Sequence, residues 1–392
     1  MPRIFSIIGL LVMALAWVRA ADLPAAELTA EEKVKVRALI QQLGDRSYKA
    51  RETAANQIVE YGRAAEPLLR EALNHPMPEV RTRCARLLPI AMQHDLEKLI
   101  KAFLDDKEGK KPTPLAGWER FKEVAGKDEA ARELFVDLHR VEGGFMDLVE
   151  HDPAAAAAKM SIKCQEFMQA RNFGQNVGTP TQVALMLFAL LHPKLKVDPN
   201  SQNFFSSGLY TMSFNQRGKE VLKENPAVRK MLVQYMQNSH QNMGHQFIWI
   251  IANIELKDAA DIVRRHIKSA ERDPYTRSFA IATLGKIGNR SDIVELLPLL
   301  EKTESIGSVQ FGNGSAIHTQ LRDVALASLI LLSGQDLSDY NFAYLKAFNN
   351  GMGRMNFNFA LSPGMLGFND DATRTAAIKK WRDWYEVEKK KK

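Results

Sequence analysis

The stretch KARETAANQIVEYG, residues 49–62, places Arg51 three residues before the pair Ala54 and Ala55, and Ile58 three residues after that pair. Positions three, four and seven residues beyond the arginine share one face of an α-helix. Alanine at the centre of an apolar face lets a neighbouring helix approach closely, which stacked helical hairpins require. The stretch therefore predicts one helix of a repeated helical array.

The same pattern recurs, with an arginine followed by a small residue, then a small or aliphatic residue, then an aliphatic one. The copies are Arg51-Ala54-Ala55-Ile58, Arg81-Cys84-Ala85-Leu88, Arg277-Ala280-Ile281-Leu284 and Arg322-Ala325-Leu326-Leu329. Gly62, Gly288 and Gly334 follow three of the copies, and glycine commonly ends a helix in the left-handed conformation. Amphipathic runs between the copies predict the partner helices, at residues 64–73, 259–267 and 291–300.

Helix starts are marked by a capping side chain before a proline, at Asp152-Pro153, Thr179-Pro180, Asn225-Pro226 and Asp273-Pro274. Thr29 followed by Glu32 predicts a capping box ahead of the first helix. We find no convincing alternation of apolar and polar residues of the kind that indicates a strand. The sequence therefore predicts an all-α fold, an α-solenoid of helical hairpins with irregular loop insertions.

This arginine-bearing helix, paired with a second amphipathic helix, resembles the HEAT or armadillo-like repeat, including the group labelled "PBS lyase HEAT-like". The resemblance covers residues 30–92 and 244–334. Residues 319–342, together with 117–135 and the ending KKWRDWYEVEKKKK, are similar to exported HEAT-repeat proteins of planctomycete-type bacteria. The resemblance implies a repeat shape and carries over no activity, because the lyase label describes the repeat alone.

These patterns divide the chain into predicted segments. They are a signal peptide (1–20), an N-terminal HEAT-like block (28–104), a charged linker with a short helix (105–128), a main helical-repeat domain with loop insertions (129–348), and a Gly/Asn/Phe-rich loop followed by a C-terminal capping helix with a lysine tail (349–392). Trp381, Trp384 and Tyr385 lie on that last helix. We expect them to cap the last repeat, and membrane anchoring is the alternative.

The N-terminus has the composition of a secretory signal peptide. Arg3 precedes an apolar run from Ile4 to Val18, and Val18 and Ala20 are the small residues expected before a cleavage site. We therefore predict cleavage after Ala20 and export to the periplasm, the cell envelope or the medium. The alternative is an uncleaved membrane anchor, although the run is shorter than the about 20 residues of a spanning helix. No later segment predicts a transmembrane helix.

Residues 1–20 contain Arg3 and Arg19 and no acidic residue, so their removal lowers the formal net charge from +7 to +5. The mature chain remains basic, but export argues against a nucleic-acid partner. Cys84 and Cys164 are the only cysteines of the 392-residue chain, too few for a disulfide scaffold. Each falls at an inward-facing helical position, so we expect buried free thiols, with a disulfide as the alternative.

No motif in the sequence names a reaction. The histidines are scattered, and the chain has no HExxH, no CxxC, no nucleophile elbow and no phosphate-binding loop. Asp198 to Gln202 imitates the start of a calcium loop, but Leu209 stands where the bidentate glutamate belongs, so we interpret it as a turn. We therefore predict no metal, no cofactor and no catalytic residue. An enzyme whose site residues are distant in sequence is a third possibility.

Long insertions carry the candidate partner-binding residues, because insertions in repeat proteins often map to the binding face. Residues 195–217 form a polar segment containing Phe204, Phe205 and Tyr210, and residues 349–371 contain Met352, Phe357 and Phe359. Exposed aromatic residues are common anchors of binding surfaces. In the alternative interpretation, the aromatic side chains of residues 195–217 pack back onto the solenoid as a small satellite core. Residues 303–315 are a further predicted loop.

The predicted function is a non-catalytic exported scaffold or binding module for another envelope protein, because a helical stack offers a broad surface and needs no cofactor. The alternative is a structural envelope component that binds an anionic polymer or surface through its positive charge. Lys389–Lys392 would then contribute, although such a run is more often a solvated tail.

Overall fold

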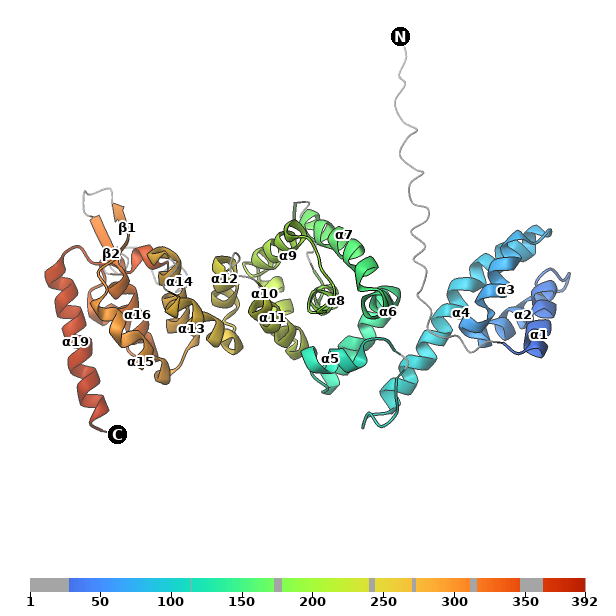
Figure 1. Ribbon diagram of the computed structural model, residues 1–392, viewed down its shortest axis with the longest axis horizontal. Helices are drawn as coiled ribbons and strands as arrows, with labels where there is room; N and C mark the ends of the chain where they lie inside the picture. The colour runs from blue at the N-terminus through green and yellow to red at the C-terminus, as the bar shows by residue number, and fades with distance from the viewer. Residues whose placement is uncertain are drawn as a thin grey trace, which may run out of the picture. The chain divides into compact units, whose positions relative to one another are not determined.

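The computed structural model (Figure 1) describes residues 28–113, 115–172, 178–239, 244–269, 273–310, 316–345 and 362–391. Its α-helices are α1 (Ala30–Gln42), α2 (Tyr48–Glu60), α3 (Glu66–Glu71), α4 (Pro78–Asp105), α5 (Trp118–Ala125), α6 (Glu129–His151), α7 (Pro153–Asn172), α8 (Pro180–Leu190), α9 (Pro199–Met212), α10 (Gln216–Lys223), α11 (Pro226–Asn238), α12 (Gly244–Ile254), α13 (Ala260–Lys268), α14 (Pro274–Ile287), α15 (Ile293–Leu296), α16 (Leu321–Leu332) and α19 (Asp371–Lys389). The fold is all-α and solenoid-like, as predicted.

Short 3₁₀ segments and one strand pair connect these helices. They are η1 (Gly62–Ala65), η2 (Ala72–Asn74), η4 (Lys257–Ala259), η5 (Arg290–Asp292), η6 (Leu297–Glu301), η7 (Leu337–Tyr340), η8 (Pro363–Met365), β1 (Ser305–Gln310) and β2 (Ala316–Gln320). The chain divides into two compact units. The first ends at Ala157 and includes Lys194–Lys196, and the second comprises Ala158–Pro193 and Val197–Lys392.

The predicted helix starts are confirmed. The side chains of Thr179, Asn225 and Asp273 accept hydrogen bonds from backbone N–H groups of the first turn, and Asp152 Oδ1 accepts one from Ala155 N at 3.1 Å. Thr29 forms the expected capping box, with Glu32 N donating to Thr29 Oγ1 and Thr29 N donating to Glu32 Oε2. These caps satisfy N–H groups that have no partner inside the helix.

The first unit is built on two groups of buried residues. Helices α1 to α4 enclose an apolar core that includes Val36, Ala54, Ile58 and Cys84. Further along, Trp118 of α5 lies 4.8 Å from Phe103 of α4 and 5.1 Å from Phe135 of α6, as ring centroid distances. The short helix after the charged linker therefore packs on both α4 and α6.

Two buried titratable side chains lie on α6. Burial lowers the pKa of His139 to about 4, and its Nε2 hydrogen bonds to the Ala116 carbonyl at 3.0 Å, so the ring is neutral at pH 7. Burial also raises the pKa of Asp147, against the opposing charges of Arg63 and His151. Both side chains are buried where α6 packs against the segments that precede it.

The predicted repeat register is confirmed by burial. Ala54, Cys84, Ala280 and Ala325, three residues after each arginine, are all 0% exposed. The positions four and seven residues after each arginine are buried as well, except for the exposed Ala85. Cys84 and Cys164 are buried and unpaired, and burial raises their thiol pKa values to about 11 and about 12.

Helices α14 and α16 show how closely the small residues allow two helices to approach. A Cβ placed on Gly285 of α14 would lie 2.7–2.8 Å from atoms of Ser328 on α16, closer than real Cβ contacts. Ser328 Oγ donates to the Ile281 carbonyl across the same contact at 2.9 Å. The interface therefore excludes even a methyl group at Gly285.

The glycines that follow the repeat helices are required for two different physical reasons. Gly62 and Gly334 have φ of 55° and 74°, the left-handed conformation that was predicted. Gly288 is extended instead, with φ −73° and ψ −168°. A Cβ there would lie 2.5 Å from the Leu284 carbonyl oxygen and 2.6 Å from Asp292 Oδ2, so space rather than backbone conformation requires the glycine.

The prediction that residues 195–217 form a polar loop is wrong, because most of this segment is helical. Asp198 caps α9, with its Oδ1 accepting from Ser201 N at 3.0 Å, and Pro199 occupies the first turn. Phe205, Leu209 and Met212 recur at helical spacing and are 0% exposed. Asn, Gln and Ser residues on the other faces concealed this apolar stripe.

The expectation of no strand and of a loop at 303–315 is also wrong. Strands β1 and β2 form an antiparallel pair in which Val309 faces Ile317 and Gly307 faces Thr319, with an irregularity near Ser305. Ile317 and Thr319 are 0% exposed while His318 is exposed, so β2 does alternate. Five residues are too short a run to distinguish this alternation from a loop.

The close helix contacts yield a stability prediction. Ala280→Leu or Ala325→Leu adds volume at a fully buried position, so each should lower the free energy of unfolding by about 1–3 kcal/mol. Ala154→Leu, at an exposed position on α7, is the matched control and should be nearly neutral. Urea unfolding measures all three, and equal losses at the three positions would contradict this packing register.

Candidate functional site

A set of arginines occupies one position, four residues after the N-cap of a helix. The pairs of N-cap and arginine are Ser47–Arg51, Met77–Arg81, Asp128–Arg132, Asn225–Arg229, Asp273–Arg277 and Asp370–Arg374. The sequence pattern identified Arg51, Arg81 and Arg277. It missed Arg132 and Arg229 because large residues follow them, and it missed Arg374 although Ala377 and Ile378 fit the pattern.

These arginines share a set of acceptors, the carbonyl groups of preceding chain segments. The contacts are Arg51 to Asp45 and Arg46, Arg81 to His75 and Pro76, Arg132 to Phe103 and Asp106, Arg229 to Lys223, Arg277 to Ile267, and Arg374 to His318. Carbonyls at a helix end have no partner within the helix and carry partial negative charge. A guanidinium there satisfies them and links the helix to the segment before it, whereas the acceptor of Arg374 is a carbonyl of strand β2.

Arg322, the fourth arginine identified from sequence, does not belong to this set, because it follows its N-cap residue Gln320 by two positions. Its Nε donates to the side-chain oxygen Oε1 of Gln320 at 2.6 Å, and its Nη2 lies 3.3 Å from Asp371 Oδ1. It therefore supports the contact between α16 and α19 rather than a preceding helix end.

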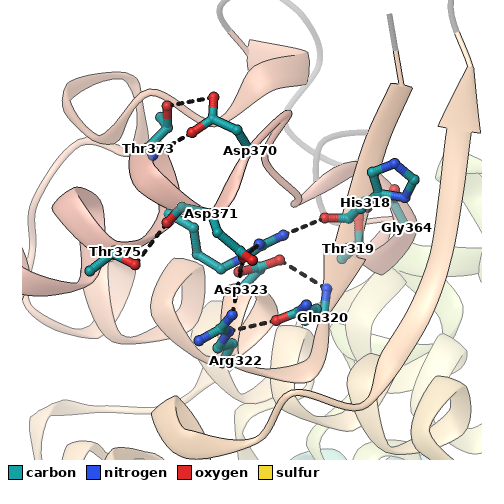
Figure 2. Close-up of polar contacts among 11 residues, drawn as sticks. His318, Thr319, Gln320, Arg322, Asp323, Gly364, Asp370, Asp371, Thr373 and Thr375 are labelled. Atoms are coloured by element: carbon teal, nitrogen blue, oxygen red, sulfur yellow. Dashed lines mark hydrogen bonds and ion pairs between the residues drawn. The ribbon is translucent and has the colours of Figure 1, made fainter.

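The last member of the set forms a buried ion pair (Figure 2). The side chains of Arg374 on α19 and Asp323 on α16 are 3% and 0% exposed, and Arg374 Nε lies 2.8 Å from Asp323 Oδ1. Asp323 Oδ2 also accepts from Gln320 N at 2.9 Å, while Arg374 donates to the His318 carbonyl at 2.8 Å and contacts Asp371. A buried pair is stable when such additional hydrogen bonds surround it.

This cluster attaches the C-terminal helix to the last repeat. Burial raises the pKa of Asp323, and the hydrogen bond from Arg374 opposes that rise. Trp381, on the same helix, is 0% exposed and donates from Nε1 to Ser333 Oγ at 3.1 Å, so it caps the last repeat as predicted. Because Arg374 and Asp323 are buried and pair with each other, we assign this cluster a structural role.

A second feature of unit 2 is a row of aromatic side chains across successive helices, which we call the aromatic row. Its members are Tyr210 of α9, Phe214 in the following turn, Trp249 of α12, and Phe279 and Tyr275 of α14. Successive ring centroids, in that order, lie 4.8, 6.2, 4.8 and 4.9 Å apart. Helices α9, α12 and α14 are packed in sequence, so the row crosses neighbouring repeats.

The aromatic row is partly open to solvent. Phe214 and Tyr275 are 52% and 46% exposed, Tyr210 and Trp249 are half-buried, and Phe279 is buried. Large rings held by neighbouring rings on helices lose little conformational freedom on binding, which suits them as anchors of a partner surface. The row is therefore the candidate binding surface of unit 2.

The structure separates the residues that the sequence proposed for partner binding. Phe205 is 0% exposed, with its ring 5.5 Å from Phe167 and 5.4 Å from Tyr235, so the expectation of an exposed ring is wrong there and the alternative of core packing is correct. Phe204 is 38% exposed, and Tyr210 belongs to the aromatic row. Met352, Phe357 and Phe359 lie outside the described residues.

Sequence reasoning did not find Phe214, Trp249, Tyr275 and Phe279 as one surface. Phe214 stands in the polar segment that was singled out, but the other three lie on helices α12 and α14. Tyr275 and Phe279 have the four-residue spacing of one helix face. Their proximity to Trp249 depends on how α12 packs against α14, which no local pattern contains.

Two grooves add little to this surface. One of about 410 Å³ lies between α1 and the α3–η2 segment. The other, of about 530 Å³, lies between α13 and the η5–α15 segment, where Arg264 pairs with Asp292 at 2.7 Å and Lys268 with Glu295 at 3.1 Å.

Within the described residues, no three or more His, Cys, Asp or Glu side chains gather to hold a metal ion. None of the described helices is long and apolar enough to cross a membrane.

The buried ion pair yields a prediction. Arg374→Met leaves Asp323 buried without its partner, so we expect a loss of about 3–5 kcal/mol in the free energy of unfolding. Arg382→Met on the same helix removes only an exposed pair with Glu301 and should cost less than about 1 kcal/mol. Urea unfolding compares the two variants, and a similar small loss in both would show that the buried pair does not hold α19.

Comparison with protein families matches residues 36–110 to HEAT repeats. The matched range contains most of α1 and all of α2 to α4, in which Arg51 and Arg81 hold the preceding turns. Searches of curated proteins and of solved structures find no match. The first helical block is thus similar to HEAT repeats, and an all-α, solenoid-like fold extends through the described residues.

Proposed function

We propose that this protein is a non-catalytic, exported helical-repeat scaffold that binds another protein of the cell envelope through the aromatic row. The aromatic row is the single observation that carries the binding proposal. Five rings, four on neighbouring helices and Phe214 in a turn, contact one another in series, and two of them, Phe214 and Tyr275, are about half exposed. Stacked repeats commonly present such extended surfaces to other proteins.

The rigidity of the surface supports a binding role. Trp249 and Phe279 are held on α12 and α14, whose contact is continued by the close approach of α14 to α16 at Gly285. Anchors that are ordered before association lose less entropy when the complex forms. A row of rings placed on helices is therefore better suited to binding than the same rings on a loop.

The exported location is part of the proposal and rests on the sequence of residues 1–20. An early arginine, an apolar run and small residues before Ala21 are the features that signal peptidase recognises. Both cysteines are buried with raised thiol pKa values, so the fold is compatible with an oxidising compartment.

Binding of an anionic polymer is the second candidate, and one observation favours it. Lys389, Lys390 and Lys391 are exposed at the end of α19, on a chain whose formal charge is positive. Contacts between exposed charges weaken steeply as salt rises, whereas contacts with aromatic rings change little. Retention of the partner at high salt therefore distinguishes protein binding through the rings from polymer binding through the lysines.

The binding proposal predicts the behaviour of Phe214→Ser/Tyr275→Ser. Both rings are partly exposed, so the variant should melt within about two degrees of the parent and yet lose the partner captured by crosslinking in the native cell. Tyr48→Ser, which removes a ring that is 67% exposed in unit 1, is the control and should retain the partner.

Phe205→Ser completes this comparison, because its ring lies in the core. It should lose about 3–5 kcal/mol of stability, as expected for removal of a buried aromatic side chain. Undiminished capture by the Phe214→Ser/Tyr275→Ser variant would refute the assigned surface.

The exported location has its own test. N-terminal sequencing of the protein purified from its native cell should begin at Ala21, because Val18 and Ala20 suit the peptidase. Recovery of a chain that retains Met1 in the membrane fraction would instead indicate an uncleaved anchor.

A further inference from the structure

We propose that protonation of His139 releases helix α5 from α6, so that the contact between these helices is an acid-sensitive latch. The latch lies in unit 1 and is independent of the aromatic row, whose residues belong to unit 2. The His139 side chain connects the two helices directly. It lies on α6 and is 3% exposed, and its Nε2–H donates to the carbonyl of Ala116, two residues before α5, at 3.0 Å.

Helix α5 is short and has a glycine at each end. Gly117 and Gly126 have φ of 88° and 109°, backbone conformations that other residues rarely adopt. The eight residues between them are too few to form a stable helix in isolation. The position of α5 therefore depends on its contacts with the rest of unit 1, and the two glycines are natural hinge points.

The contacts between α5 and α6 are mainly aromatic, and His139 belongs to them. The ring centroids of Trp118 and Phe121, on α5, each lie 5.1 Å from that of Phe135 on α6. The Phe135 ring in turn meets the His139 ring edge to face at 4.7 Å. The imidazole is thus part of the apolar cluster that holds α5, an environment that suits a neutral ring and disfavours a charged one.

The proton affinity of His139 gives the latch its direction. Burial lowers the pKa of His139 to about 4, against the opposing effect of the Ala116 carbonyl. Once α5 leaves, the ring meets water and its pKa returns to about 6.5. The open form therefore binds a proton more tightly than the closed form. Closure is fully favoured above about pH 6.5 and weakens as the pH falls from there toward 4.

Two cations already contact the same ring cluster. The Arg132 guanidinium, on α6, lies 4.1 Å from the ring centroid of Phe103 and 5.5 Å from that of Trp118. On α5, Lys122 Nζ lies 5.9 Å from the Trp118 centroid. A positive charge on His139 would add to these charges, so electrostatic repulsion acts in the same direction as the cost of burying the imidazolium.

Carboxylates of α4 and α6 around the latch are engaged by arginines. Glu150 of α6 lies 2.6 Å from Arg120 of α5, and Glu97 of α4 lies 3.1 Å from Arg140 of α6. Glu142 follows His139 by three residues on α6, at a point where the backbone leaves helical geometry, with φ −145° and ψ 39°.

Asp147, the other buried titratable group on α6, responds to acid with the opposite sign. Burial raises its pKa, against the charges of Arg63 on η1 and His151 on α6. A carboxyl group whose pKa is raised in the folded state takes up a proton more readily when folded, so acid favours its burial. Opening at low pH therefore cannot come from Asp147.

The test is amide hydrogen exchange of the full chain at pH 7 and pH 5, measured by mass spectrometry and corrected for the intrinsic effect of pH on exchange. Peptides from residues 115–125 report on the latch, and peptides from α2 are the internal reference. With a pKa of about 4 closed and about 6.5 open, the opening of α5 should increase about twentyfold from pH 7 to pH 5. Exchange in α2 should stay unchanged.

Three variants assign the effect to His139. His139→Gln retains an amide donor for the Ala116 carbonyl, and His139→Phe retains a neutral ring in the cluster. Neither side chain titrates, so α5 should exchange equally at the two pH values in both. His151→Gln, at an exposed position on the same helix, is the matched control and should retain the pH dependence of the parent.

The parent alone can overturn the latch, whether or not the variants fold. Equal opening of α5 at pH 7 and pH 5 would do so, and equal acid-induced opening of α2 and α5 would indicate unfolding of the whole unit instead. Acid-induced opening that persists in His139→Gln or His139→Phe would also overturn it. None of these results bears on the aromatic row, which the capture experiment tests separately.

Discussion

The hydrogen bond from an arginine side chain to the carbonyls of preceding chain is the interaction on which the repeat structure depends. It recurs from Arg51 to Arg374, always four residues after a helix N-cap. The arginine at this position depends on two features of the chain around it. The preceding segment ends with carbonyls that need donors, and the new helix begins with a fixed direction that carries the guanidinium back toward them. Because Arg presents several donors in a planar fork, one side chain can hold two carbonyls, as Arg51 and Arg81 do.

Small residues on the same helices meet the second requirement of a solenoid, which is close stacking. Ala280 and Gly285 of α14 and Ala325 and Ser328 of α16 bring these two backbones together, and Ser328 adds a hydrogen bond across the contact. The arginine therefore sets the direction of each helix, and the small residues set its distance from the next. The same arginine position is used by α19, where the Arg374 guanidinium pairs with the buried Asp323 carboxylate of α16.

A binding role follows from the same packing. The helices that stack closely also hold Trp249, Phe279 and Tyr275 in place, so the aromatic row is ordered by the contacts that stabilise the fold. Phe205 makes the contrast clear, since it lies on α9 with Tyr210 but turns inward onto Phe167. Neighbouring aromatic residues on one helix thus divide between core and surface according to the face that each occupies.

The sequence by itself determined the all-α fold, the helix starts and the repeat register, because each depends on residues within one or two turns of a helix. Asp273 before Pro274 and the series Arg277, Ala280 and Leu284 are local signals of this kind. The helical nature of 199–212 was missed because polar residues concealed its apolar stripe, and the β1–β2 pair was missed because its alternation is short.

Only the tertiary structure decided which side chains meet. The aromatic row joins residues 210 to 279, and the buried pair joins Asp323 to Arg374. These contacts are absent from any local pattern because their partners lie on different helices. Their distances and exposure arise from the angle and spacing at which those helices pack, which depend on all the side chains of each interface together.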